Sequence, residues 1–281
     1  MSLGSGGDRP GLGPVRRFDE IDSTNRYLAD EARAGAPHGL VAVAKHQTAG
    51  RGRLGRRWEA PPGANLLVSI LLRPEVLRPS GATSALGPPG PEAGPQAYTL
   101  AVALSAADAC GDVAGVHPGL KWPNDLVVDD RKLAGVLAET VGPKVAQAVV
   151  VGLGLNVGWP QGGESAGDAG ADPDADAGAP WAVSLAGLTG RSFDSDLLLD
   201  SVLEHLAGRI TGLLEPGGLS RQSHEYLTRC VTLNRAVRVE EHSESFTGIA
   251  AGISEDGQLI VETASGRRVV TAGDVIHLRH R

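Results

Sequence analysis

Short apolar runs bounded by turn residues fill much of the first half of the chain. Their lengths suit strands, which are predicted at 15–18, 40–45, 65–72, 126–128 and 145–157. The run at 65–72 is apolar at nearly every position, which is typical of a central strand buried on both faces. Because several of these strands follow one another as hairpins without an intervening helix, the pattern predicts a mixed, largely antiparallel sheet.

Helical spacing of apolar residues occurs between and after these strands. The first predicted helix starts at Ser23 or Thr24, which are both good N-caps, and stops at Gly35. Further helices are predicted at 97–109, 194–214 and 219–230. Helices flanking a largely antiparallel sheet make the fold class α+β. The Ser-Thr-Asn triplet at 23–25 has two open interpretations, capping of the helix or binding of a polar ligand atom at the helix start.

The pattern changes after residue 231. Short strands separated by glycine-containing turns are predicted at 237–240, 245–253, 258–262 and 267–270. They indicate a second domain, a small β-barrel at 231–281, after a main domain at 15–230. The glycine-rich residues 1–14 are expected to be a disordered leader. Two stretches without periodicity are expected to be surface insertions, at 78–96 and 161–180.

The bulk composition narrows the classes of function. The chain has 281 residues and a net charge of −7, without a basic tail or stripe, which argues against nucleic acid as the main partner. No apolar run is long enough for a signal peptide or a membrane helix, so a cytoplasmic protein without a membrane partner is expected. Cys110 and Cys230 are far apart and lack metal-ligand spacing, so two reduced, buried thiols are expected.

One basic segment stands out in this acidic chain. Residues 50–58, called the arginine loop below, hold three glycines, four arginines and Trp58. Glycine allows close backbone approach, arginine suits phosphate or carboxylate, and an indole face can stack on a ring. The segment therefore indicates a loop that closes over an anionic, partly aromatic ligand, with a solvated surface loop as the alternative. Its glycine spacing formally matches a dinucleotide fingerprint, but the prolines and glycine at 61–63 exclude the required helix.

Other polar residues stand out at predicted strand ends and loops. The sequence contains no Walker A motif, and no Ser-His-Asp or Cys-His arrangement can be argued from spacing. A set of polar and cationic groups without a nucleophile fits phosphoryl or nucleotidyl chemistry, which depends on positioning reactants and neutralising charge. The candidates are Ser23, Thr24, Asn25, Gln47, Arg51, Arg53, Arg56, Trp58, Lys121, Asn124, Asp125, Lys132 and Asn156.

Four sequence blocks resemble those of biotin protein ligases, in the same order and at similar separations. They are Gly-Arg-Gly-Arg-x-Gly-Arg at 50–56, Lys-Trp-Pro-Asn-Asp at 121–125, Lys-Leu-Ala-Gly at 132–135 and Gly-x-Gly-x-Asn at 152–156. The triplet at 23–25 and Gln47 also fall where that family has them. The resemblance implies a class II synthetase-like catalytic domain at 15–230 that binds biotin and ATP, and an SH3-like barrel at 231–281.

The family's activity, as the resemblance implies it, has two steps. Biotin and ATP, with Mg2+, give biotinyl-5′-AMP and pyrophosphate, and biotin then passes to a lysine of a biotin carboxyl carrier domain of a biotin-dependent carboxylase. A lipoate or octanoate ligase or transferase of the same superfamily is the alternative, although the blocks at 50–56 and 121–125 speak against it. Since 22 residues precede Ser23, a monofunctional enzyme without a DNA-binding domain is expected. The resemblance allows a monomer or a homodimer.

The resemblance also assigns residue roles. The catalytic residues would be Lys132 and Arg53. Asp125 is the expected contact of Mg2+, directly or through water, because magnesium is commonly held by one or two carboxylates together with phosphates; a turn aspartate is the alternative. The biotin-binding set would be Ser23, Thr24, Asn25, Gln47, Gly50, Arg51, Gly52, Arg53, Lys132 and Gly135. The ATP-binding set would be Arg53, Arg56, Trp58, Lys121, Asn124, Lys132 and Asn156.

Overall fold

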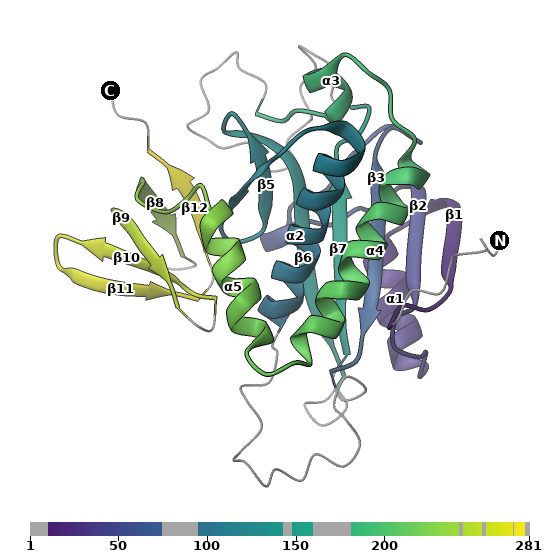
Figure 1. Cartoon of the computed structure of the whole chain (residues 1–281), viewed down its shortest axis with the longest axis horizontal. Coiled ribbons are helices and arrows are strands. Elements are labelled where there is room, and N and C mark those ends of the chain that lie inside the picture. Colours follow the sequence, from purple (N-terminus) through teal and green to yellow (C-terminus); the bar gives the residue numbers. More distant parts are fainter. Residues whose placement is uncertain are drawn as a thin grey trace, which may run out of the picture.

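A seven-stranded sheet forms the centre of the molecule (Figure 1). The computed structural model describes residues 11–74, 95–142, 148–159, 181–241, 244–254, 257–271 and 273–278. The sheet has the order β1-β2-β3-β7-β6-β5-β4. Its strands are β1 (Val15–Ile21), β2 (Val41–Gln47), β3 (Leu66–Leu72), β4 (Gly119–Lys121), β5 (Asp125–Val128), β6 (Arg131–Val141) and β7 (Ala148–Leu155).

The pairing of these strands confirms the predicted mixed, largely antiparallel sheet. Strands β1 and β2 are parallel, and the other neighbours are antiparallel. Strand β3 is buried at every position and lies between β2 and β7, as its continuous apolar run predicted.

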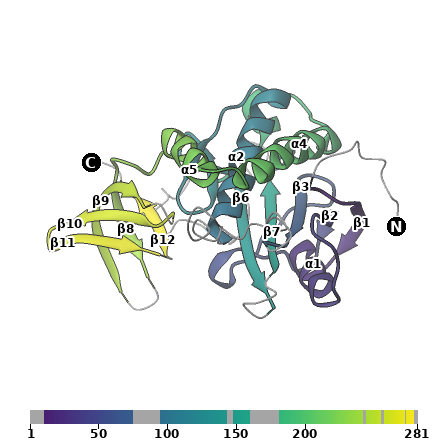
Figure 2. The same ribbon diagram turned by 60° about the horizontal axis from the view of Figure 1, so that its bottom comes forward.

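Helices cover both faces of this sheet (Figure 2). Helix α1 (Thr24–Arg33) packs on one face, and its N-cap is Ser23, as predicted. The opposite face carries α2 (Pro95–Ala114), with α4 (Ser195–Leu213) packed against it and α5 (Gly218–Arg229) against both. A short helix that the sequence did not predict, α3 (Leu185–Thr189), precedes α4. Among the described residues, no helix is long and apolar enough to cross a membrane.

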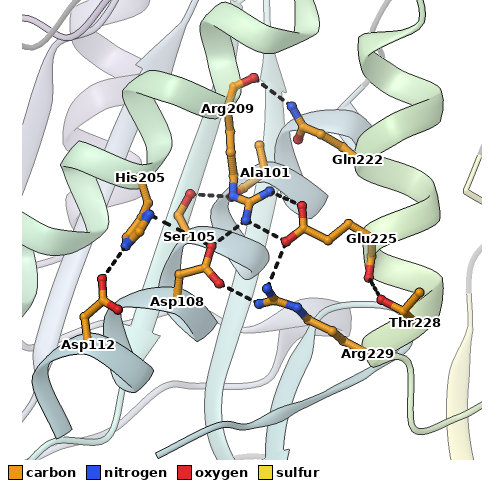
Figure 3. A network of polar contacts seen from close by, with 10 residues as sticks. All are labelled: Ala101, Ser105, Asp108, Asp112, His205, Arg209, Gln222, Glu225, Thr228 and Arg229. Carbon is orange, nitrogen blue, oxygen red and sulfur yellow. Dashed lines mark hydrogen bonds and ion pairs between the residues drawn. The ribbon is translucent and has the colours of Figure 1, made fainter. Parts of the chain in front are cut away.

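An ion-pair network ties α2, α4 and α5 together (Figure 3). Arg209 of α4 donates to Glu225 of α5 at 2.8 and 2.9 Å and also pairs with Asp108 of α2. Arg229 of α5 donates to Asp108 at 2.6 Å. Burial alone would raise the pKa of Asp108, but the hydrogen bonds from Arg229 and Arg209 outweigh burial and lower that pKa. The network therefore fixes how the three helices cover the sheet.

The predicted leader and insertions fall mostly outside the described residues. Residues 1–10, 78–94 and 161–180 are not described by the structure. The leader prediction is wrong for residues 11–14, because Gly13 donates its backbone N–H to Gly39 at 2.8 Å and Leu12 packs against the core. The last two residues of the first predicted insertion, 95 and 96, belong to α2.

A second, smaller sheet lies beside the β4 end of the first (Figure 1). Its order is β11-β10-β9-β8-β12, with β8 (Ala236–Glu240), β9 (Ser245–Ile253), β10 (Leu259–Thr263), β11 (Gly266–Val270) and β12 (Asp274–His277). The sequence predicted the first four of these strands and missed β12. Trp122, which follows β4, is buried in the core of this sheet and donates its indole N–H to Gly257 at 2.9 Å. The residues after β4 thus join the two sheets.

The two cysteines differ in burial. Both thiols are free, as predicted. Cys110 is fully buried in α2, and burial raises the pKa of its thiol to about 12. The prediction of a buried thiol is wrong for Cys230, which is only partly buried at the end of α5.

Candidate functional site

A cavity opens on the face of the large sheet that α1 covers. Glycines form its floor and leave space where other residues would place side chains. It holds about 1130 Å³, counting the part open to solvent, which suits a small organic ligand. Across the strands, Gly152 pairs with Ser69 and Leu137, and Gly154 pairs with Leu67 and Gly135. On β7, Val151 and Leu153 belong to the core on the face that α2 covers. The alternating residues Gly152 and Gly154 therefore face the cavity on the α1 side.

These glycines are required by the groups that lie on them. A Cβ at position 152 would lie 2.2 Å from the side-chain oxygen of Asn25, and one at position 154 would lie 2.4 Å from the indole ring of Trp58. Both distances are far inside van der Waals contact. The glycine-broken end of the predicted strand therefore makes room for Asn25 and Trp58 against the sheet.

One end of the cavity, called the neutral end, consists of Thr24, Asn25, Gln47 and Ser69. Thr24 donates its backbone N–H to Oε1 of Gln47 at 2.7 Å, and its hydroxyl lies 2.7 Å from that of Ser69. Ser69 donates to Oδ1 of Asn25 at 2.6 Å. Thr24, Asn25 and Ser69 are buried, so these bonds remove the penalty of burying polar groups and hold the side chains in place.

A carboxylate beside the neutral end connects it to the arginine loop. Oε2 of Glu139 on β6 accepts a hydrogen bond from Nδ2 of Asn25 at 2.8 Å. The same oxygen accepts from Nη2 of Arg51, also at 2.8 Å. Glu139 and Arg51 are partly exposed, so the contact with buried Asn25 gives this ion pair its defined position.

Lys132 reaches the cavity because β6 contains a bulge. Leu126 pairs with Ala134, but the next residue, Val127, pairs with Lys132, so Leu133 is an extra residue in β6. Leu133 and Ala134 both point into the core on the face that α2 covers. In a regular strand Lys132 would share the face of Ala134, whereas the bulge turns Lys132 into the cavity.

The opposite end of the cavity, called the charged end, consists of Arg53, Arg56, Asp125, Lys132 and Asp274. Nζ of Lys132 lies 2.8 Å from Oδ1 of Asp125, and 5.5 Å from the centre of the Trp58 ring. Arg56 forms an ion pair with Asp274 of β12. In the described part of the chain, no cluster of three or more His, Cys, Asp or Glu side chains could hold a metal ion.

The arginine loop is a hairpin that contacts the smaller sheet. Arg51 and Arg57 form an antiparallel bridge, and Trp58 donates its N–H to Gly50 at 3.0 Å. Only the 3-10 turn η1 (Arg53–Gly55) interrupts the hairpin, and no α-helix follows before β3, so rejection of the dinucleotide fingerprint is confirmed. Leu54 at the tip has a φ of 55° and is 65% exposed, so its apolar side chain projects into solvent.

Arg53 is the least exposed arginine of the loop. Its Nη1 donates to Oδ1 of Asn124 and to the carbonyl of Gly273, both at 3.3 Å. Burial lowers the pKa of Arg53, and the neighbouring carboxylate of Asp125 partly offsets this effect. The loop, the turn after β4 and the smaller sheet thus meet at one guanidinium group.

The structure brings together nearly all the predicted site residues. Those that line the cavity are Ser23, Thr24, Asn25, Gln47, Arg51, Gly52, Arg53, Arg56, Trp58, Lys121, Asn124, Asp125, Lys132 and Gly135. Gly50 does not line it. A Cβ there would lie 2.3 Å from the carbonyl oxygen of Trp58, so this glycine allows the hairpin to close.

The predicted ATP-binding role of Asn156 has no support in the geometry. Asn156 is 4% exposed and lies outside the cavity. Its Nδ2 donates to the carbonyls of Lys132 and Val183, and its Oδ1 accepts from Asn65. Because these partners already satisfy the side chain, Asn156 supports the backbone behind Lys132 and does not line the cavity.

Several residues of the site were missed from the sequence. Ser69 was detectable, since it is the polar residue in an otherwise apolar strand. Glu139 and Asp274 carried no local signal, because their roles depend on partners more than 80 positions away in the sequence.

Sequence comparisons show that the chain is similar to biotin ligases. The sequence profile of the Biotin/lipoate A/B protein ligase family matches residues 18–156, and that of the Biotin protein ligase C terminal domain matches residues 232–278. The biotin–[acetyl-CoA-carboxylase] ligase of Mycobacterium tuberculosis is 36% identical over 265 residues, which cover 92% of this chain and 87% of that protein. The enzyme of the same name from Paracoccus denitrificans is 34% identical over 258 residues, covering 90% and 96%.

Solved structures show the same fold. The biotin protein ligase from Aquifex aeolicus in complex with biotin and ATP matches with a TM-score of 0.72 and 24% identity, covering 95% of this chain and 99% of that chain. The biotin protein ligase from Leishmania major in complex with biotin matches with a TM-score of 0.57 and 22% identity, covering 92% and 98%. Identities this low support the architecture alone.

Proposed function

The chain belongs to the biotin protein ligase family, and we propose that its cavity joins biotin to ATP and passes the activated biotin to a protein lysine. The observation that carries this proposal is the pairing of a neutral, hydrogen-bonding end with a cationic end in one cavity. Biotin has a neutral ureido ring at one end and a carboxylate at the other. The two ends of the cavity therefore match the two ends of biotin.

The neutral end suits the ureido ring. Thr24, Ser23, Gln47 and Asn25 offer hydroxyl and amide groups on the cavity wall. A ureido group presents one acceptor and two donors, and burying any of them without a partner costs about 1–3 kcal/mol. Groups already fixed by their own hydrogen bonds can satisfy the ring with little loss of conformational freedom.

The charged end suits the first chemical step. A carboxylate oxygen of biotin attacks the α-phosphorus of ATP, a new P–O bond forms, and the bond to the β-phosphate breaks to release pyrophosphate. Lys132 belongs to the charged end, 2.8 Å from Asp125, where it would stabilise charge on the biotin carboxylate and the α-phosphate. Arg53, Arg56, Lys121 and Asn124 surround the space for the phosphates, and Trp58 offers an aromatic face to the nucleotide.

The second step needs access for a lysine. Its neutral amine attacks the acyl carbon of biotinyl-5′-AMP, the bond to the AMP oxygen breaks, and the amine loses a proton. The arginine loop, held by Gly273 and Asp274 in the structure, would cover the intermediate and exclude water until that lysine enters.

Asp125 would be the protein contact of Mg2+. Its carboxylate lines the cavity beside the predicted phosphate site. Magnesium is commonly held by one or two carboxylates together with substrate phosphates and water, so a single carboxylate fits this donor set. When bound, the metal would neutralise phosphate charge. Asp125 pairs with Lys132 in the structure, so it would have to exchange that partner for the metal.

The partner and cellular setting extend the same proposal. The names of the relatives point to a biotin carboxyl carrier domain of a carboxylase as the acceptor. We assign catalysis to residues 15–230 and completion of the charged end to residues 231–281, because Asp274 lies on the smaller sheet. A cytoplasmic location fits a substrate of this class and two free thiols.

A reconstituted reaction tests this function. The protein is mixed with biotin, ATP, Mg2+ and a purified carrier domain, with a carrier whose acceptor lysine is replaced by arginine as control. We expect release of pyrophosphate that depends on biotin, and mass labelling of the unmodified carrier only. Absence of both signals would reject the proposal. Labelling with lipoate or octanoate in place of biotin would establish the alternative activity of the superfamily.

A further inference from the structure

Glu139 occupies an unusual position among the residues around the cavity. It lies on β6 two residues beyond Leu137, on the face that α1 covers, and pairs across the sheet with Val150. One oxygen of its carboxylate accepts hydrogen bonds from two separate parts of the site, Asn25 of α1 and Arg51 of the arginine loop, each at 2.8 Å. The carboxylate thus links the floor of the neutral end to the loop that covers the cavity.

The carboxylate is also the nearer of two acceptors that decide which group donates in each hydrogen bond of the neutral end. An ionised carboxylate can only accept, so Asn25 must present its NH2 group to Glu139 and its oxygen to Ser69; the Leu137 carbonyl, at 3.3 Å from the same NH2 group, favours the same orientation. Ser69 must then use its single proton to bond Asn25. The contact of 2.7 Å between Ser69 and Thr24 therefore needs the proton of Thr24, for which Oε1 of Gln47, at 3.0 Å from the same hydroxyl, is a second and longer acceptor.

Because the direction of these hydrogen bonds is fixed, it also decides which hydrogen-bonding groups face a ligand in the cavity. With the proton of Thr24 directed at Ser69, the remaining lone pair of the Thr24 hydroxyl is an acceptor on the cavity wall. An acceptor at this place matches an N–H of the ureido ring. If the Thr24 proton pointed into the cavity, its hydroxyl would instead present a donor to that N–H.

We propose that Glu139 is a positioning residue for biotin: it orients Asn25, sets the direction of the bonds from Thr24 through Ser69, and holds Arg51 of the arginine loop. The inference rests on the proposed function, since it concerns recognition of the ureido ring. It predicts that Glu139 acts mainly on the binding of biotin and on retention of biotinyl-5′-AMP. Use of ATP depends on the opposite end of the cavity.

The first test compares Glu139→Gln with Glu59→Gln. Glutamine keeps the size of Glu139 but can present an NH2 group to Asn25, so only the longer contact with the Leu137 carbonyl still favours the original direction of the bonds. Glu59 is the matched control, because it is a loop carboxylate that pairs with Arg57 at 3.4 Å and does not line the cavity. We expect Glu139→Gln to raise the Kd for biotin, measured by calorimetry without ATP, about 10-fold. We expect the KM for ATP to change less than about 2-fold, and the control to bind biotin like the wild type.

A second variant separates this positioning role from a merely structural one. Asn25→Asp should place two carboxylates against each other and nearly abolish biotin binding. Adding Glu139→Gln lets the new amide donate to the carboxylate introduced at position 25, while the other oxygen of that carboxylate accepts from Ser69, which restores the original direction. We expect the double variant to bind biotin at least about 5-fold more tightly than Asn25→Asp alone.

The outcomes are distinguishable. Unchanged biotin affinity in Glu139→Gln, or no recovery in the double variant, would overturn the proposal for Glu139. Absence of biotin binding by the wild-type protein would instead overturn the proposed function. Circular dichroism of each variant confirms that it is folded before its affinity is compared.

Discussion

The polar groups at the two ends of the cavity are stabilised by different kinds of partner. The neutral end is built from α1 and adjacent strands, and its side chains are satisfied by one another: Thr24 by Gln47 and Ser69, and Asn25 by Ser69 and Glu139. The charged end draws on the large sheet, the arginine loop and the smaller sheet. Its cations are paired with carboxylates, Lys132 with Asp125 and Arg56 with Asp274.

This difference implies different behaviour on ligand binding. A ligand can join the neutral end without displacing its internal hydrogen bonds, so that end is preorganised. Phosphates arriving at the charged end compete with Asp125 and Asp274 for the same cations. Part of the attraction between phosphates and cations is therefore offset by breaking protein ion pairs. The neutral end should accordingly govern affinity for biotin, and the charged end should govern the rate of adenylate formation.

The largest effect is expected from removing the Lys132 cation of the charged end. Lys132→Ala should slow biotin-dependent pyrophosphate release by about 100-fold or more, because it removes a preorganised charge from the transition state. Affinity for biotin in the absence of ATP should change only a few-fold. Lys132→Arg is the control that keeps the positive charge. Pyrophosphate release at the wild-type rate in Lys132→Ala would remove Lys132 from the reaction.

The next effect concerns the floor of the neutral end. Gly152→Ala should raise the Kd for biotin about 10-fold or more, since the new methyl group must displace the side chain of Asn25. Gly208→Ala on α4 is a matched control, because a Cβ there meets no atom within 4 Å. Binding measured by calorimetry would decide, and equal affinities of the two variants would contradict the importance of the glycine floor.

A smaller effect concerns the attachment of the smaller sheet, on which the charged end depends. Burial, with Lys121 and Arg235 nearby, lowers the pKa of His277 to about 4, although Asp130 opposes the shift. His277 also contacts Thr232 at 3.1 Å. Because the pKa in the unfolded chain is about 6.5, neutral His277 stabilises the fold above pH 6.5, and this contribution is lost as the pH falls from about 6.5 towards 4.

Urea unfolding checks this pH dependence. Between pH 7.5 and pH 5.5 the wild type should lose on the order of 1 kcal/mol more than His277→Asn in its free energy of unfolding, since asparagine cannot titrate. Loss of ATP binding should accompany acidification before loss of biotin binding. Identical pH dependence in the wild type and the variant would show that His277 does not contribute.

The smallest effect should come from releasing Arg56. Asp274→Asn removes the carboxylate that competes with phosphate, so the KM for ATP should fall by about 2- to 3-fold, the scale of a partly exposed ion pair. Affinity for biotin should not change. Glu241→Gln, which alters a carboxylate of the same region that pairs with Arg268, is the control. A raised KM for ATP in Asp274→Asn would mean that Asp274 supports the arginine loop more than it competes with phosphate.

The sequence alone determined the elements and the chemical groups of this protein. Apolar runs predicted most of the large sheet and four strands of the smaller one, because the spacing of apolar residues reflects local backbone geometry. The arginine loop, Ser23 to Asn25, and Lys132 were identified because their motifs are continuous in the chain.

Tertiary structure decided how these groups are used. It turned Lys132 into the cavity through a bulge that depends on pairing with β5, and it turned Asn156 away from the site into the support behind Lys132. It also recruited Ser69, Glu139 and Asp274, whose neighbours come from distant segments. Strand register, close approach over glycine and the choice of ion-pair partner all depend on contacts between distant residues, which no local pattern encodes.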